Sequence, residues 1–162
     1  MLNFLKPTLY IQISPERVTV KNVKSGASIS EVPEMAISSG NKPTILAAGG
    51  QARLAAAAQA AQLINPFAHP RSLVSDFTYA QLLLKYLVRQ VLGRSILALA
   101  PQVVIHPLGS PAGGFTQVEI RAFLEMGHSV GASKVFVWTG RLLNDAEVAS
   151  HSFPLTEGQL GE

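Results

Sequence analysis

Hydrophobic and polar residues alternate in two runs near the start of the sequence, at residues 9–13 and 17–23. Alternation with a period of two is typical of β-strands that bury one face. Ser14, Pro15 and Glu16 lie between the runs, and proline presets φ for the second position of a tight turn. The pattern therefore predicts a β-hairpin.

Shorter elements are expected next. Residues 27–37 form a third strand-like run that Pro33 interrupts, as at a sheet edge or a bulge. Residues 44–48 are apolar and favour a short strand. Residues 51–63, QARLAAAAQAAQL, are rich in strong helix formers, and the prolines that follow prevent the helix from continuing.

Two longer amphipathic patterns predict helices with defined starts. Thr78 and Gln81 have the spacing of a capping box before a helical run that ends at Gly93. Thr116 and Glu119 have the same spacing before a second helix. Both helices present apolar residues at intervals of three and four, so each is expected to pack on a core.

Apolar runs at residues 102–105 and 134–138 flank the second of these helices and are typical of buried strands. The order strand–helix–strand predicts a parallel pair with a crossover connection. From Arg141 onward the sequence is polar and loses its periodicity. We expect one short helix at residues 142–148 and a frayed end after it.

Composition narrows the class of protein. Of the 162 residues, 48% are hydrophobic and 14% are charged, which predicts one globular unit with a buried core. The net charge of +3 comes from scattered basic residues, so no nucleic-acid partner is expected. The sequence has no cysteine, and its 4 histidines lack metal-ligand spacing, so neither disulfides nor a metal site is expected.

The motifs resemble those of a known family. Residues 115–137, FTQVEIRAFLEMGHSVGASKVFV, resemble the segment of the bacterial actin MreB that carries the signature Thr-x-Val-Glu-x-Arg-Ala. Residues 64–77 and 30–37 are similar to two further segments of that family, in the same order. The signature residues here are Thr116, Val118, Glu119, Arg121 and Ala122.

The resemblance implies an α/β fold, the ribonuclease-H-like half-domain of actin-like ATPases. Its mixed sheet has three antiparallel-connected strands followed by a β-α-β unit. We expect residues 1–140 to form this domain, with a helical insert at about 49–72, and residues 141–162 to form a polar C-terminal tail. The second domain of the family is absent from this sequence.

The sequence departs from the family at the nucleotide site. The family's Asp-x-Gly-Thr falls on Gln12, Ile13, Ser14 and Pro15, so the carboxylate that organises magnesium and the glycine that lets the backbone approach phosphate are both missing. The family's Glu-Glu-Pro is replaced at residues 139–141. These departures from the family predict no cofactor and no ATPase activity.

Three other features near this site have two interpretations each. Glu119 matches the family glutamate that positions the attacking water, but it also completes a capping box with Thr116, which we favour. The loop at residues 106–115 is glycine-rich enough to suggest phosphate binding, but a simple connection is favoured. His106 is expected to be a packed histidine rather than a general base.

Two apolar groups are candidates for contact with a membrane or a partner. One lies at the amino-terminal end, and the other lies where the family has a hydrophobic loop; packing in the core is the alternative for both. The residues are Leu2, Phe4 and Leu5, and Ile96, Leu97 and Leu99. No signal peptide or spanning segment is visible, so we expect a cytoplasmic protein. Peripheral contact with the inner face of the membrane is a second interpretation, which the two apolar groups suggest.

The favoured function is a non-catalytic MreB-like protein that acts by binding in cell-shape or cytoskeletal organisation. Its partner would be an MreB filament, a shape-determining complex or a second copy; Trp138, Leu142 and Leu143 are candidates for an uncovered, dimer-forming surface. The alternative is half of an actin-like ATPase completed by oligomerisation or a partner chain. A third interpretation is a degenerate gene product that folds but has no present role. A nuclease is disfavoured because residues 1–15 contain no acid.

Overall fold

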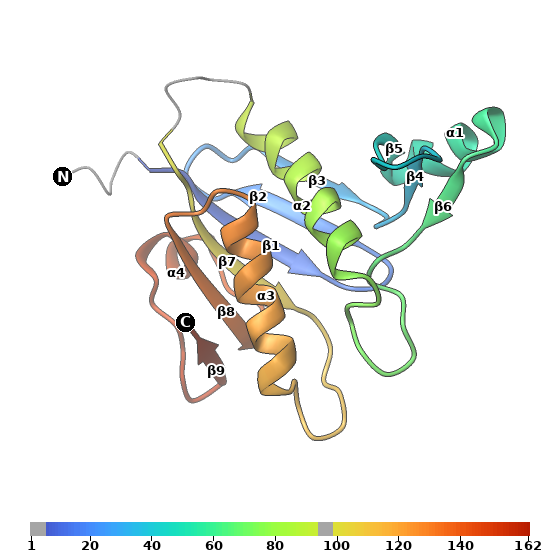
Figure 1. The fold of residues 1–162 in the computed structure, drawn as a ribbon. Coiled ribbons are helices and arrows are strands. Elements are labelled where there is room, and N and C mark those ends of the chain that lie inside the picture. Colours follow the sequence, from blue (N-terminus) through green and yellow to red (C-terminus); the bar gives the residue numbers. More distant parts are fainter. Residues whose placement is uncertain (1–5, 94–98) are drawn as a thin grey trace.

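A computed structural model describes residues 6–93 and 99–162, and its centre is a six-stranded mixed sheet with the order β3-β2-β1-β7-β8-β9 (Figure 1). β1–β2 and β2–β3 pair antiparallel, β1–β7 and β7–β8 pair parallel, and β8–β9 pairs antiparallel. The strands are β1 (Thr8–Ile13), β2 (Val18–Asn22), β3 (Ser28–Glu31), β7 (Gln102–Pro107), β8 (Lys134–Gly140) and β9 (Gly158–Gly161). This arrangement contains the predicted hairpin, the third strand and the β-α-β unit.

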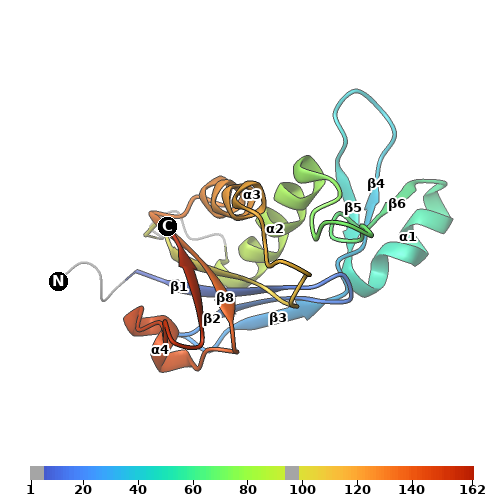
Figure 2. The same ribbon diagram turned by 90° about the horizontal axis from the view of Figure 1, so that it is seen from below.

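Helices cover both faces of this sheet. α2 (Phe77–Leu92) and α3 (Gln117–Ser129) lie on one face, and α4 (Asp145–Ser150) lies on the other (Figure 2). The alternation along β1 explains the two layers, because Leu9, Ile11 and Ile13 belong to the core under α2 and α3, whereas Tyr10 belongs to the cluster under α4.

A smaller lobe stands beside the large sheet (Figures 1 and 2). It contains a three-stranded sheet with the order β5-β4-β6, formed by β5 (Ile45–Ala48), β4 (Met35–Ile37) and β6 (Gln62–Ile64). A short 3-10 turn, η2 (Gly49–Gln51), leads into α1 (Ala52–Gln59). The lobe shares apolar contacts with the main core through the face of β4 that carries Met35 and Ile37.

Two expectations about this lobe need correction. The run at residues 27–37 is broken at Pro33 as expected, but its halves are β3 and β4, which belong to different sheets. The helix expected at residues 51–63 ends at Gln59, because residues 62–64 pair with β4 as a strand. The alanine-rich sequence favours a helix locally, and pairing with a distant strand overrides that preference.

The start of α2 also differs from the prediction. Asp76, and not Thr78, is the N-cap: its Oδ1 accepts a hydrogen bond from Tyr79 N at 3.0 Å. An aspartate two residues earlier satisfies a free N–H of the first turn equally well, so the helix begins at Phe77. The helix ends before Gly93, as expected.

The C-terminal segment is more ordered than its sequence suggests. The helix expected at 142–148 is α4, but the expectation of fraying after it is wrong, because β9 pairs with β8. The expectation that Trp138 and Leu143 are uncovered is also wrong: their exposed fractions are 0% and 7%, whereas Leu142 is 61% exposed. The division of the chain into domains at residue 140 stays a prediction.

Candidate functional site

The carboxyl ends of the parallel strands bring several candidate residues to one edge of the large sheet. Ile13 at the end of β1 lies opposite Pro107 at the end of β7, and β8 ends alongside at Gly140. α3 begins near this edge at the Thr116 cap. In sheets of this kind, ligands bind at the carboxyl ends of the strands, so we call this region the carboxyl edge.

A cavity of about 520 Å³ opens at the β8 side of the carboxyl edge. Its walls are the loop after β7, the beginning of α3, and the ends of β8 and β9. Among the lining residues are Gly109, Ser110, Phe115, Thr139, Arg141 and Glu157. Because the Arg141 and Glu157 side chains are bound to each other, the cavity has no uncompensated charge from this pair.

The hairpin turn at the carboxyl edge uses its own polar groups. Ser14 N donates to Arg17 O at 2.9 Å, and Arg17 N donates to Ser14 Oγ at 3.0 Å. Pro15 has no N–H, and its carbonyl accepts a hydrogen bond from Asn65 Nδ2 at 2.9 Å. These groups are therefore committed to closing the turn and joining it to the smaller lobe.

The two residues before the turn lie within β1. Ile13 is fully buried in the core under the helices, and so it does not face the carboxyl edge. Gln12 is half-buried on the other face, opposite His106 in the register, and its amide also interacts with the Tyr10 hydroxyl. The structure therefore brings Gln12 near a buried polar pair instead of a phosphate-binding loop.

Glu119 forms the predicted capping box with Thr116. Its Oε2 accepts hydrogen bonds from Thr116 N at 2.7 Å and from Thr116 Oγ1 at 3.0 Å, and Thr116 Oγ1 accepts one from Glu119 N at 3.2 Å. Its Oε1 accepts a hydrogen bond from Ser72 Oγ at 3.4 Å. Both carboxylate oxygens thus have protein partners; that Glu119 has no catalytic role stays a prediction.

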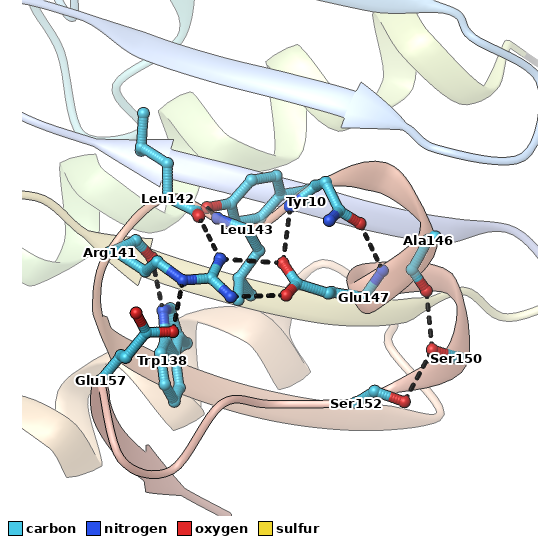
Figure 3. A network of polar contacts seen from close by, with 11 residues as sticks. Tyr10, Trp138, Arg141, Leu142, Leu143, Ala146, Glu147, Ser150, Ser152 and Glu157 are labelled. Atoms are coloured by element: carbon cyan, nitrogen blue, oxygen red, sulfur yellow. Dashed lines mark hydrogen bonds and ion pairs between the residues drawn. The ribbon is translucent and has the colours of Figure 1, made fainter.

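Arg141 organises a charged network after β8 (Figure 3). Its guanidinium holds Glu147 through two contacts of 2.6 and 3.0 Å, and its Nε donates to Glu157 Oε2 at 2.7 Å. The Arg141 hydrogen bonds lower the pKa of Glu147 to about 2, and the two carboxylates raise the pKa of Arg141. The arginine is therefore engaged in fixing the C-terminal segment.

A buried polar pair at the carboxyl edge was not predicted as a unit. Tyr10 Oη lies 2.6 Å from His106 Nδ1, and His106 Nε2 lies 3.0 Å from Gly140 O. His106 is 1% exposed, and burial lowers its pKa. The expectation of a packed histidine is met, but nothing in the sequence indicates that Tyr10, 96 residues away, is its partner.

Of the candidates for membrane contact, Leu2, Phe4, Leu5, Ile96 and Leu97 lie outside the described residues. Leu99 is described and is 38% exposed. Within residues 6–93 and 99–162, no helix is long and apolar enough to cross a bilayer. The same part of the chain contains no cluster of three or more histidine or carboxylate side chains that could hold a metal ion.

A family model described as MreB/Mbl protein matches residues 9–145. The chain belongs to the MreB/Mbl family. This confirms the resemblance inferred from the signature around Thr116 and Glu119. No curated protein matches the chain.

Two solved structures of a relative have the same fold as this MreB/Mbl chain. MreB5 of Spiroplasma citri bound to ADP has a TM-score of 0.63 and 17% sequence identity, and the match covers 83% of this chain and 38% of that one. The same protein bound to AMPPNP has a TM-score of 0.60 at 16% identity, covering 82% and 38%. The likeness confirms the actin-like half-domain fold, over less than two fifths of the relative's length.

Proposed function

We propose that this chain is a non-catalytic member of the MreB/Mbl family that acts by binding a protein partner in a bacterial actin-like cytoskeleton. The partner is an MreB filament or a membrane-bound complex of the shape-determining machinery, met in the cytoplasm or at the inner face of the membrane. The observation that carries the proposal is the hairpin turn at residues 14–17, whose polar groups bond to one another and to Asn65.

The chemistry of the carboxyl edge supports this proposal. A nucleoside triphosphate with magnesium is held by several free backbone N–H groups and by carboxylates that bind the metal or its waters. Here Ser14 N is used inside the turn, Pro15 has no N–H, and Gln12 stands where the family has its aspartate. Glu119 is occupied by its own helix cap.

The proposal is tested by two assays on the purified chain. Isothermal titration with Mg-ATP is expected to give no heat of binding, with a full-length MreB as the positive control. Sedimentation with preformed MreB filaments is expected to bring the chain into the pellet in a saturable way. A chain that stays in the supernatant at saturating filament concentration contradicts the partner that we propose.

Membrane contact is tested separately with anionic liposomes. If Leu99 contributes to such contact, Leu99→Glu reduces flotation with the liposomes and leaves filament binding unchanged. Leu155→Glu, at a residue that is 67% exposed in the C-terminal segment, is the matched control. Equal flotation of both variants and the original chain contradicts a role for Leu99.

The alternative, half of an ATPase completed by a second chain, is favoured by one observation, the cavity that opens at the carboxyl edge. It predicts phosphate release that rises with the square of protein concentration. Glu119→Gln separates the two functions, because glutamine preserves the capping box and cannot act as a carboxylate base. Concentration-dependent hydrolysis that Glu119→Gln abolishes would overturn the non-catalytic proposal.

A further inference from the structure

The segment that includes α4 closes one face of the large sheet. We call residues 141–153 the α4 cover. Leu143 and Val148 of the cover are buried against the sheet. The sheet residues beneath the cover are Tyr10, Val104, Phe136 and Trp138. Trp138 Nε1 donates to Arg141 O at 2.9 Å, so the indole is tied to the start of the cover (Figure 3).

A chain of hydrogen bonds through His106 joins the sheet to the cover. Leu143 N donates to Tyr10 Oη at 3.2 Å, Tyr10 Oη lies 2.6 Å from His106 Nδ1, and His106 Nε2 lies 3.0 Å from Gly140 O. A carbonyl oxygen only accepts, so Nε2 carries the proton. Nδ1 of the neutral imidazole is then the acceptor for the Tyr10 hydroxyl.

A proton added to Nδ1 removes the acceptor of the Tyr10 hydroxyl. His106 Nδ1 and Leu143 N would then both donate toward Tyr10 Oη, which the Gln12 amide also contacts, and the hydrogen bond from the Tyr10 hydroxyl to Nδ1 would be lost. The imidazolium would also be buried, since His106 is 1% exposed. The closed cover is therefore compatible with the neutral form of His106.

A second histidine lies in the cover itself. The His151 ring is 4.8 Å from the Phe136 ring and 6.5 Å from the Phe153 ring, measured between centroids. Its Nε2 is buried and has no hydrogen-bond partner among the described residues. Burial, followed by the charges of Lys134 and Lys24, lowers the pKa of His151. Like His106, it fits the closed cover in its neutral form.

Burial and neighbouring charge disfavour an added proton at the two histidines in different ways. Near His106, Arg141 binds both Glu147 and Glu157, which leaves one net negative charge, so burial and not charge disfavours the imidazolium there. Near His151, the charges are those of the two lysines, and the carboxylate of Glu162 lies 3.9 Å from Lys134. An imidazolium at either place would be buried or would face cations.

We propose that the α4 cover is an acid-sensitive latch, in which neutral His106 and His151 hold the cover on the sheet and their protonation favours its release. Release exposes the sheet face that carries Tyr10, Phe136 and Trp138. The latch is a conformational device of this chain and does not depend on the partner or on nucleotide.

The sign of the pH effect follows from linkage. The pKa of each histidine is lowered in the closed state and returns toward its ordinary value of 6.5 when the cover opens. The stability of the closed state is therefore complete above that value and is lost as the pH falls below it. Each histidine raises the ratio of open to closed cover by up to about tenfold per pH unit in this range.

The first readout is hydrogen exchange at the Leu143 amide, which donates to Tyr10 across the latch. Between pH 7.5 and 5.5 its protection factor is expected to fall, by up to about tenfold for each histidine, while the amides of β1 and β7 keep theirs. The second readout is acrylamide quenching of Trp138, the single tryptophan in the chain, which is expected to rise over the same range. Equal loss of protection in β1 and β7 would indicate global unfolding and would overturn the latch.

The variants His106→Gln and His151→Gln separate the two histidines. His106→Gln keeps a side-chain donor and acceptor without a titratable ring, so the pH dependence of Leu143 protection is expected to fall to that of His151 alone. His128→Gln, at an exposed histidine on α3, is the matched control and is expected to keep the full dependence. An unchanged dependence in His106→Gln overturns the role of His106.

A measurement on the unmodified chain covers the case in which His106→Gln does not fold. Nitrogen chemical shifts of the imidazole identify which ring nitrogen is protonated. At pH 7.5 the His106 ring is expected to carry its proton on Nε2 and to leave Nδ1 free to accept. A proton on Nδ1, or a cationic ring in the closed state at this pH, would overturn the proposal.

Discussion

At the residue scale, backbone conformation departs from residue preference at two helix ends. Among the described residues, Ala60 at φ +48° and His151 at φ +54° are the non-glycine residues with positive φ, and they are the C-caps of α1 and α4. A Cβ makes the left-handed region unfavourable by roughly 1–2 kcal/mol, and glycine avoids this cost. His151 offsets part of it through its ring contacts, whereas Ala60 is exposed.

Ala60→Gly is therefore expected to raise the free energy of unfolding by about 0.5–1 kcal/mol. Ala57→Gly is the matched control, because Ala57 is also exposed but lies within α1, where glycine costs about 1 kcal/mol relative to alanine. Urea denaturation followed by circular dichroism measures both. Destabilisation by Ala60→Gly would show that α1 does not end in the left-handed conformation.

At the element scale, α3 shows how a family signature can serve the fold. Thr116 and Glu119 close the first turn of the helix through reciprocal hydrogen bonds, and Glu119 also reaches Ser72 in the loop before α2. The same carboxylate thus orders a helix start and a neighbouring loop. The carboxylate therefore has a structural use in this fold that does not itself require a nucleotide.

Substitutions in this box are expected to separate hydrogen bonding from charge. Thr116→Ala removes the N-cap acceptor and is expected to lower the free energy of unfolding by about 1 kcal/mol. Glu119→Gln is expected to cost less, because glutamine also serves in a capping box. Chemical denaturation at pH 7 measures both, and a larger loss in Glu119→Gln than in Thr116→Ala would point to a need for the negative charge.

At the scale of the whole molecule, the C-terminal segment completes the sheet and covers its second face. β9 adds an edge strand, and the segment before it packs on Trp138. Gly140 and Gly158 make this packing possible: a Cβ on either would lie within 2.7 Å of the Trp138 ring. Arg141 then ties the beginning of the segment to Glu147 in α4 and to Glu157 before β9.

The Arg141 network predicts a loss of stability in acid. The pKa of Glu147 is lowered from 4.5 to about 2, so its contribution is present above pH 4.5 and is lost as the pH falls toward 2. Arg141→Gln is expected to flatten this part of the stability–pH curve, which lies below the range of the histidine latch. The control is Arg121→Gln, which removes an exposed pair with Glu125 and is expected to leave the curve unchanged. Parallel curves for Arg141→Gln and the original chain would contradict this role of Arg141.

Local signals were sufficient for several elements. The alternation at residues 9–13 and 17–23 predicted the hairpin, and the Thr116–Glu119 spacing predicted the start of α3. The signature around those residues was sufficient for the family. The degenerate turn at Ser14 and Pro15 was also visible, because it depends on residue type alone.

The sequence by itself determined the hairpin, the start of α3 and the turn at Ser14 and Pro15, because each depends on residues that are close together in the sequence. Only the tertiary structure decided that residues 62–64 are a strand, that β9 extends the sheet, and that the α4 cover buries Trp138. The hydrogen bond between Tyr10 and Leu143 joins residues 133 positions apart in the sequence. Pairing and burial over such separations depend on which distant surfaces meet, and local propensity does not predict that.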